Sequence, residues 1–188
     1  MTYVKSLLRK KYILQRKKKH LSKRKLNFNS IFKLIKKNFN SKKITIAGYY
    51  PSAYELDILP FLQEVSKKNF RIVLPVIKKS NNMCFKQWVF KEPLCVNKYG
   101  MLEPENSKKE IIPDLIMVPL VAFDKNLNRI GYGKGYYDRA LGKINKKKKN
   151  TVFLGIAYSS QKCLSVPVNK YDIKLHYIFT EQGIISSK

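Results

Sequence analysis

The sequence predicts an α/β protein built on a mostly parallel central sheet. Short apolar runs alternate with amphipathic stretches along the chain, which is the pattern of strands joined by helices. Residues 115–122 form a continuous apolar run, as expected of a strand that is buried on both faces. With 188 residues and 44% apolar content, the chain can bury one sizeable core, and we expect a single domain over residues 1–188.

The first half of the chain predicts three helices and three strands. Residues 4–19 predict a basic amphipathic helix packed on the domain, with Val4, Leu7, Leu8 and Leu14 near one face. Pro60 could break the third helix, because proline is poorly tolerated inside a helix. In chain order, the remaining elements are a helix at 30–38, a strand at 44–49, a helix at 52–65, and strands at 71–77 and 83–90.

The second half continues the alternation after a long irregular segment. Residues 91–113 contain three prolines and little periodicity, so we expect a surface loop there. The strand at 115–122 then leads through a polar turn, 124–128, into a glycine-rich segment. The last expected elements are a helix at 136–144 and strands at 151–157, 177–180 and 184–185.

The chain is strongly basic, with a net charge of +27, which raises the question of a nucleic-acid partner. The first 43 residues carry 16 of the 39 Lys and Arg, and Glu55 is the first acid. The excess is mostly lysine in a chain rich in Ile and Asn, a bias that an AT-rich genome also produces. We therefore interpret the lysine runs as solvated surface and expect no specific nucleic acid.

Cysteine use and hydropathy favour a cytoplasmic protein. Cys84, Cys95 and Cys163 are odd in number and match no zinc pattern, so we expect free thiols. No apolar run approaches the length of a membrane span, and no apolar segment of a signal peptide is present at the N-terminus. We expect no membrane association and a monomer, with an oligomer left open.

The most specific motif is the segment Ile130-Gly-Tyr-Gly-Lys-Gly-Tyr-Tyr-Asp-Arg139. Glycines let backbone N–H groups point into one concavity, and Lys134 between two of them supplies a mobile positive charge for phosphate. Asp138 is suited to hold Mg²⁺ shared with a nucleotide. Such a segment alone is often only a tight turn, but lysine inside it and Tyr-Tyr-Asp-Arg after it favour phosphate binding.

The chain resembles the 5-formyltetrahydrofolate cyclo-ligase family, also called 5,10-methenyltetrahydrofolate synthetases. The residues that carry the resemblance are spread over nearly the whole chain, and the glycine block is their most specific part. They are Lys5-x-x-x-Arg9, Gly48-Tyr-Tyr-Pro51 with Glu55, the segments 114–124 and 129–139, Gly155-Ile-Ala-Tyr158, Gln161, Pro167 and Asp172.

The resemblance implies a three-layer α/β/α sandwich and a specific reaction. That reaction converts 5-formyltetrahydrofolate and ATP to 5,10-methenyltetrahydrofolate, ADP and phosphate. The γ-phosphoryl group of ATP is transferred to the formyl oxygen, and N10 then attacks the formyl carbon. The implied ligands are ATP as co-substrate, 5-formyltetrahydrofolate and Mg²⁺.

The resemblance also implies roles for particular residues. Lys134, Arg129 and Tyr137 are expected to be catalytic, and Asp138 and Asp172 are expected to hold the metal. The nucleotide is expected to contact Lys5, Ser6, Leu7, Leu8, Arg9, Ile130, Gly131, Tyr132, Gly133, Lys134, Gly135, Tyr136, Tyr137 and Asp138. The folate is expected to contact Tyr50, Glu55 and Tyr136, and Glu55 is chemically apt because a carboxylate can accept the N–H donors of a pterin.

Each of these residues also has an interpretation without a ligand. Lys5 and Arg9 would lie on a solvated helix face, and Asp138 would be an acid at a helix N-terminus, where the helix dipole favours negative charge. Glu55 with Ser52 would cap a helix, and the tyrosines would pack in the core. Two other functions stay open at this stage, a nucleic-acid-binding module and another α/β enzyme such as a sugar-phosphate isomerase, which would not bind ATP.

Overall fold

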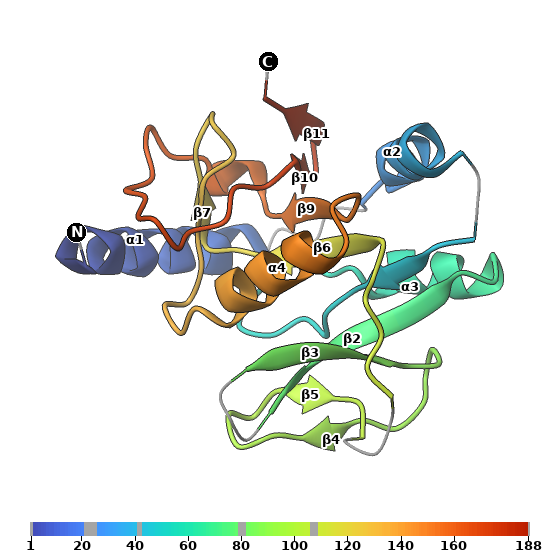
Figure 1. Ribbon diagram of the computed structural model, residues 1–188. Coiled ribbons are helices and arrows are strands. Elements are labelled where there is room, and N and C mark those ends of the chain that lie inside the picture. Colours follow the sequence, from blue (N-terminus) through green and yellow to red (C-terminus); the bar gives the residue numbers. More distant parts are fainter. Residues whose placement is uncertain (1, 21–25, 41–42, 79–81, 106–108, 188) are drawn as a thin grey trace.

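The computed structural model describes residues 2–20, 26–40, 43–78, 82–105 and 109–187 (Figure 1). Its helices are α1 (Thr2–His20), α2 (Asn29–Phe39), α3 (Leu59–Lys67), α4 (Tyr136–Lys147) and the short 3₁₀ helix η1 (Ser159–Gln161). Its strands are β1 (Thr45–Ala47), β2 (Arg71–Ile77), β3 (Met83–Gln87), β4 (Cys95–Val96), β5 (Leu102–Glu103), β6 (Leu115–Pro119), β7 (Ala122–Phe123), β8 (Arg129–Ile130), β9 (Val152–Ile156), β10 (Tyr177–Thr180) and β11 (Gly183–Ser186).

A seven-stranded sheet forms the centre of the molecule, with the order β11-β10-β9-β6-β1-β2-β3. The five inner strands run parallel, and only the edge strands β3 and β11 are antiparallel to their neighbours. The predicted mostly parallel sheet is therefore confirmed. Pro75 fits within β2 because it lies beyond the last residue pair with β1, Ala47 with Val73, so no bond of that ladder is lost.

Alternate side chains of the sheet point into two separate cores, which gives three layers. On β6, Leu115 and Met117 belong to the core shared with α2 and α3, whereas Ile116 and Val118 belong to the core shared with α4. The helices thus cover both faces of the sheet, as Figure 1 shows for α4 on the face toward the viewer. The expected α/β/α sandwich is confirmed.

Helix α1 lies at the side of the sheet, against β7 and η1. Its inner face is formed by Leu8, Tyr12 and Arg16, whose spacing of four places them one turn apart. The predicted apolar face is wrong in detail, because Val4, Leu7 and Leu14 are exposed (47%, 48% and 62%). The positions of the apolar residues do not predict the buried side of α1, because Tyr12 and Arg16 occupy much of that side.

Two elements in the middle of the chain differ from the sequence prediction. The helix expected at 52–65 starts only at Leu59, and Pro60 lies in its first turn, where its missing N–H costs nothing. The expected loop at 91–113 contains the short antiparallel pair β4 and β5. The polar turn at 124–128 is confirmed, because Asp124 accepts the backbone N–H groups of Asn126 and Asn128.

Candidate active site

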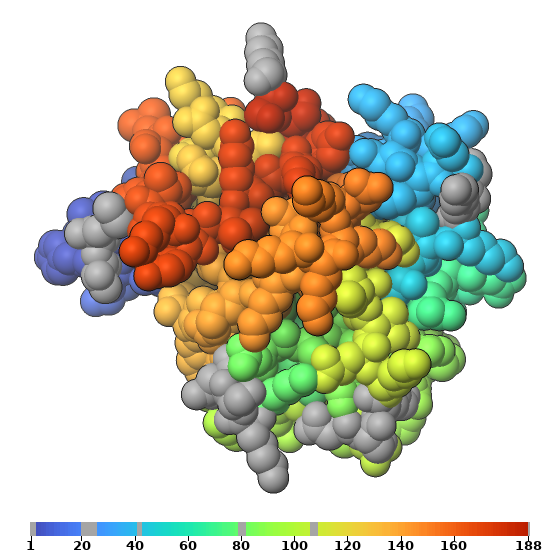
Figure 2. Space-filling model, viewed as in Figure 1, coloured from blue at the N-terminus to red at the C-terminus, as the bar shows by residue number. Residues whose placement is uncertain are grey.

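A cavity of about 1050 Å³ lies at the carboxyl ends of the inner strands. Pro119 ends β6, Ile77 ends β2, and Tyr49 and Tyr50 follow β1; all four line this cavity. Open parallel sheets characteristically bind ligands at this edge. In Figure 2 the orange segment that contains the glycine loop (130–135) and α4 borders the green segment of β3 on the outer surface.

The glycine loop enters the cavity between β8 and α4. Gly133 (φ 98°) and Gly135 (φ 67°) adopt the left-handed backbone that glycine favours, and Gly135 forms the N-cap of α4. A side chain at Gly133 would press on the guanidinium of Arg9, whose Nε donates to the Gly131 carbonyl at 2.8 Å. The Arg9 guanidinium and the first turn of α4 thus both border the glycine loop and line the cavity, an arrangement suited to an anion.

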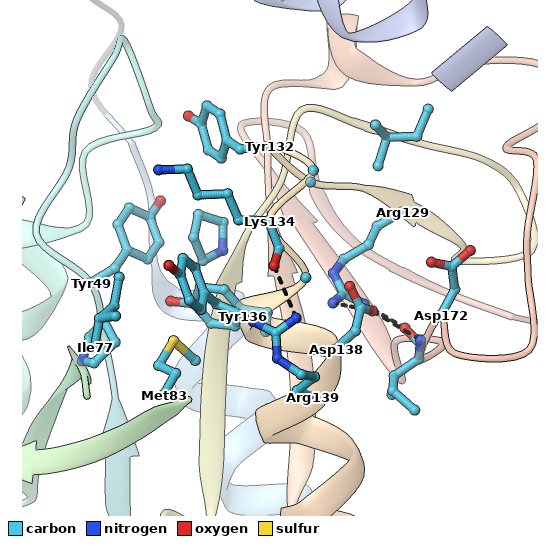
Figure 3. A pocket seen from close by; sticks show the side chains of 18 of the residues that line it. Tyr49, Ile77, Met83, Arg129, Tyr132, Lys134, Tyr136, Asp138, Arg139 and Asp172 are labelled. Carbon is cyan, nitrogen blue, oxygen red and sulfur yellow. Dashed lines mark hydrogen bonds and ion pairs between the residues drawn. The ribbon is translucent and has the colours of Figure 1, made fainter. Parts of the chain in front are cut away.

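Lys134 extends from this loop into the cavity (Figure 3). Its Nζ lies 3.5 Å from the centre of the Tyr99 ring, and it forms no ion pair among the described residues. Tyr99 belongs to the turn between β4 and β5, and its hydroxyl accepts a hydrogen bond from the Tyr136 hydroxyl at 2.8 Å. The β4–β5 hairpin thus forms a wall of the cavity opposite the glycine loop.

Two ion pairs hold the carboxylates of the site. The Arg129 guanidinium donates to Asp138 Oδ1 at 2.7 Å and to the Ile173 carbonyl at 2.5 Å, and it is almost completely buried. Lys5 Nζ donates to Asp172 Oδ2 at 2.6 Å. Asp138 and Asp172 each keep one oxygen without a hydrogen bond to the described protein, so both can still accept a ligand.

The second half of the cavity centres on the buried carboxylate of Glu55. Its Oε1 accepts the Tyr132 hydroxyl at 2.8 Å, and its Oε2 accepts the Ser52 backbone N–H at 3.0 Å. Burial raises the pKa of Glu55, while the Ser52 N–H, the Tyr132 hydroxyl and the charge of Arg16 act in the opposite direction. Ser52 and Glu55 form a tight turn rather than a helix cap, because α3 begins four residues later.

Two further tyrosines meet at this end of the cavity. The Tyr49 hydroxyl donates to the Leu56 carbonyl at 2.7 Å. The Tyr137 hydroxyl is buried and has no hydrogen-bond partner in the described part of the chain. Burial raises the pKa of both phenols well above the usual range, so both are neutral hydrogen-bond donors. An unpaired buried hydroxyl is costly, which marks Tyr137 as a group that a substrate could satisfy.

The cavity brings most of the residues expected from the sequence into one place. Tyr50, Glu55, Lys5, Arg9, Asp172 and every residue from Arg129 to Asp138 line it. Three expected nucleotide contacts do not: Ser6 and Leu7 are exposed elsewhere on α1, and Leu8 packs in the small core beneath that helix. Helical geometry explains the difference. Within residues 5–9 of α1, only Lys5 and Arg9, which are four residues apart, lie on the edge of the helix that faces the cavity.

Sequence reasoning missed Arg16 and the hairpin residues Asn97, Tyr99 and Glu103. Asn97 accepts the backbone N–H groups of Tyr99 and Met101 and donates to Glu103, so it shapes the turn. The Asn97–Gly100 segment is a recognisable turn signal that could have indicated a hairpin. Arg16 lies two turns after Arg9, which was a sign that both face the same side.

The fold and the site together define the class, an α/β enzyme whose glycine loop and acidic, aromatic pocket open into one cavity. The sequence profile of the 5-formyltetrahydrofolate cyclo-ligase family matches residues 1–181. The chain is 31% identical to the 5-formyltetrahydrofolate cyclo-ligase of Haemophilus influenzae (69% of this chain, 72% of the relative). It is 30% identical to that of Escherichia coli K12 (74% and 79%).

Solved structures agree with these relatives. The structure of Aquifex aeolicus 5,10-methenyltetrahydrofolate synthetase superposes with a TM-score of 0.74 and 29% identity, over 97% of this chain and 92% of that one. The Mycoplasma pneumoniae 5,10-methenyltetrahydrofolate synthetase gives a TM-score of 0.68 and 26% identity, over 93% and 96%.

The chain belongs to the 5-formyltetrahydrofolate cyclo-ligase family. It is accordingly a ligase of folate and one-carbon metabolism. The resemblance on which the sequence interpretation depended is confirmed. Among the described residues, no helix has both the length and the apolar character needed to cross a bilayer.

Proposed function

We propose that this chain uses ATP to close 5-formyltetrahydrofolate to 5,10-methenyltetrahydrofolate, and that both substrates bind in the 1050 Å³ cavity. The observation that carries the proposal is that one cavity joins the glycine loop to the Glu55 pocket. Tyr132 belongs to both, since it lies between Gly131 and Gly133 and donates to Glu55. The triphosphate and the formyl group can therefore meet without a movement of domains.

The nucleotide end is formed by the glycine loop, the N-terminus of α4, Arg9 and Lys134. A formamide carbon is a poor electrophile and its oxygen is a poor leaving group. Transfer of the γ-phosphoryl group to the formyl oxygen, with release of ADP, makes the carbon a better electrophile and the oxygen a better leaving group. The main task of the protein is then to align the substrates and to stabilise phosphate charge. Lys134 suits the second task, because it forms no ion pair with any residue that the structure describes.

Arg129 contributes in a different way from a direct phosphate contact. Its guanidinium is held by Asp138 and the Ile173 carbonyl, so it fixes the first turn of α4 against the loop that leads to Asp172. We propose that Arg129 keeps these two hydrogen bonds when ATP binds. It then orients Asp138 and adds positive potential to the phosphate site without contacting a phosphate group directly.

The folate end is formed by Glu55, Tyr50, Tyr136 and Tyr137. The Glu55 carboxylate can accept N–H donors of the pterin, and the aromatic rings suit a flat heterocycle. The Tyr137 hydroxyl would donate to the formyl oxygen, which would satisfy the one buried phenol that lacks a partner in the described protein. N10 then attacks the formyl carbon and loses its proton, and phosphate leaves with the original formyl oxygen.

Asp138 and Asp172 would hold Mg²⁺ together with the phosphates of ATP. The chemistry fits, because Mg²⁺ usually takes one or two protein carboxylates and completes its shell with phosphate oxygens and water. The described residues contain no cluster of three or more acidic, His or Cys side chains, and such a shared ion does not require one. When bound, the ion would shield the charge of the triphosphate.

We further propose that the chain is one domain that acts as a monomer in the cytoplasm. The described cysteines are free thiols, as a reducing compartment would keep them.

Isotope transfer tests the proposed reaction. The protein is incubated with ATP and 5-formyltetrahydrofolate that carries ¹⁸O in the formyl group, and the released phosphate is analysed by mass spectrometry. We expect one ¹⁸O atom in each phosphate that accompanies the methenyl product. Unlabelled phosphate would contradict phosphorylation of the formyl oxygen, and the absence of methenyl product would contradict the function itself.

A further inference from the structure

Arg16 is the most deeply buried cation of the described chain outside the pairs already discussed. It lies on the inner face of α1 with only 1% of its surface exposed. Its Nη2 donates to the Tyr132 hydroxyl at 2.5 Å and to the Ala53 carbonyl at 2.7 Å, and its Nη1 donates to the Leu120 carbonyl at 3.3 Å. One guanidinium thus connects α1, the end of β6, the turn before Glu55 and the glycine loop.

The hydrogen-bond chain from Arg16 to Glu55 has a fixed direction. A guanidinium can only donate, so the Tyr132 hydroxyl must accept from Arg16. The single hydrogen of that hydroxyl is then available for Glu55 Oε1, 2.8 Å away. The Tyr132 ring also lies against the guanidinium, with a distance of 5.3 Å between the guanidinium carbon and the ring centre. Glu55 Oε1 is accordingly required to be an acceptor.

Arg16 also supports the backbone that carries Glu55. Ala53 (φ 44°) and Tyr54 (φ 65°) are two consecutive non-glycine residues with left-handed backbone, which L-residues adopt at a cost of about 1 kcal/mol or more each. The hydrogen bond from Arg16 to the Ala53 carbonyl holds this turn in place. Removing the guanidinium would remove two supports of this turn, the hydrogen bond to the Ala53 carbonyl and the hydrogen bond that orients Tyr132 toward Glu55.

We propose that Arg16 is a positioning residue, whose buried guanidinium orients Tyr132 and the 52–55 turn so that the Glu55 carboxyl group faces the substrate as a hydrogen-bond acceptor. The proposal rests on the folate-binding role of Glu55 given above. It adds a residue that touches neither substrate and connects the phosphate loop to the folate pocket.

The charges around Glu55 come from several elements. Arg16 on α1 favours its ionised form, as do the hydrogen bonds from Ser52 and Tyr132. The neutral phenols of Tyr49, just after β1, and of Tyr137 on α4 face it, and they are too weakly acidic to carry charge near neutral pH. Arg16 is thus the cation that opposes the effect of burial on the Glu55 pKa.

Carboxyl NMR of the protein without substrates tests the proposal directly. The side-chain carboxyl carbons of glutamate are labelled with ¹³C and titrated in the wild type and in Arg16→Met, Arg16→Lys and Tyr132→Phe, with Glu55→Gln to assign the resonance. We expect Arg16→Met to raise the titration midpoint of Glu55 by about 1 pH unit. Arg16→Lys, which keeps the charge, should raise it less.

An unchanged Glu55 midpoint in folded Arg16→Met would overturn the proposal. If Arg16→Met does not fold, Tyr132→Phe decides, because it keeps Arg16 and removes only the linking hydroxyl. A raised midpoint in that variant supports the proposal and an unchanged one overturns it.

Kinetics separate this inference from the proposed function. The acid limb of kcat/KM for 5-formyltetrahydrofolate should move upward together with the NMR midpoint, and at the optimum kcat/KM should fall about tenfold. A midpoint that moves while the acid limb stays would overturn the positioning role. A wild-type protein that forms no methenyl product would contradict the proposed function and would leave the titration valid.

Discussion

At the scale of single residues, pairing decides which charges of the cavity can meet a substrate. Lys5 is held by Asp172 and Arg129 by Asp138, so these four side chains partly neutralise one another. Lys134 differs, because only the face of the Tyr99 ring lies against its ammonium group among the described residues. A contact of this kind is weak at an exposed site and is readily exchanged for phosphate.

Lys134→Ala should therefore impair the use of ATP without harming the fold. We expect kcat/KM for ATP to fall about 100-fold, the effect of losing a preorganised charge at a reacting group. Lys147→Ala is a matched control, since Lys147 is an exposed lysine of α4 outside the cavity. Equal ATP kinetics in the two variants would argue against the phosphate role of Lys134.

Tyr137→Phe should separate function from stability. The variant removes a buried hydroxyl without a partner in the described protein, so the free energy of unfolding should rise by about 1 kcal/mol. Turnover should fall about tenfold or more if the hydroxyl donates to the formyl oxygen. Denaturant unfolding and steady-state kinetics measure the two effects, and a less stable protein with normal turnover would refute this role.

Asp138→Asn tests the metal without removing the structural bond. Asparagine can keep the oxygen that accepts Arg129 and the Ile173 N–H, while an amide nitrogen replaces the second oxygen. We expect a clear increase in the Mg²⁺ concentration for half-maximal activity, with a thermal midpoint close to that of the wild type. A normal Mg²⁺ dependence would remove Asp138 from the metal site.

The candidate site could be predicted well wherever a local motif carried the chemistry. The alternation of glycines around Lys134 was sufficient to predict a tight, glycine-dependent loop, because the left-handed backbone at Gly133 and Gly135 is a local property. Helix spacing marks the side of α1 on which Arg16 lies and a turn signal marks the hairpin of Tyr99, but the contacts that these two residues make could not be found from local patterns. Their roles depend on partners more than 35 residues away in the sequence, which no local pattern specifies.

At the scale of elements, the start of α4 fixes the geometry of the glycine loop. Gly135 caps this helix with a left-handed backbone, and a Cβ there would lie 2.9 Å from Arg139 Nη1. That contact would also disturb the bond from Arg139 to the Lys134 carbonyl. The conformation of the loop is therefore tied to the helix that follows it.

Gly135→Ala should destabilise the protein and impair ATP binding together. We expect a loss of about 1–2 kcal/mol in the free energy of unfolding from the left-handed backbone alone. Gly131→Ala is the control for stability, because a Cβ at Gly131 meets nothing within 4 Å and its backbone needs no glycine. Similar losses in both variants would show that backbone strain at Gly135 is not the cause.

Helices and strands were predicted correctly where the burial of a periodic apolar face determines the element. The parallel strands and α2 and α4 follow from apolar runs and amphipathic spacing. The helix expected at 52–65 begins late because Ser52, Glu55 and Tyr132 make a hydrogen-bonded turn there, and tertiary contacts of this kind override helix propensity. The two-residue strands β4 and β5 are too short to show a period.

At the scale of the whole molecule, the fold joins the glycine loop and the Glu55 pocket in one cavity at one edge of the sheet. The high positive charge lies mainly outside this cavity, for example on the exposed Lys17 and Lys18 of α1. Charge of this kind attracts polyanions non-specifically, and it does not define the site.

Stability should fall as the pH is lowered from 7.5 to 5. Burial lowers the pKa of His176, whose Nδ1 accepts the Phe153 N–H at 2.9 Å and so must be unprotonated. The unfolded chain, with a histidine pKa near 6.5, then binds more protons than the folded one as pH falls through that value. Stability from this residue is complete above the unfolded pKa and is lost below the folded one.

His176→Asn isolates this contribution, because the asparagine oxygen can accept the same N–H without titrating. Chemical denaturation at several pH values should give a shallower slope for the variant between pH 7.5 and 5. Identical slopes would show that another group controls stability in this window.

The most direct test of the central claim is absorbance in the near ultraviolet, where the methenyl product absorbs and 5-formyltetrahydrofolate does not. Protein, 5-formyltetrahydrofolate and Mg²⁺ are mixed, and ATP is added last. The account predicts a rise that depends on ATP and is largely lost in Lys134→Ala. Absence of a rise with folded wild-type protein, or a rise without ATP, would contradict it.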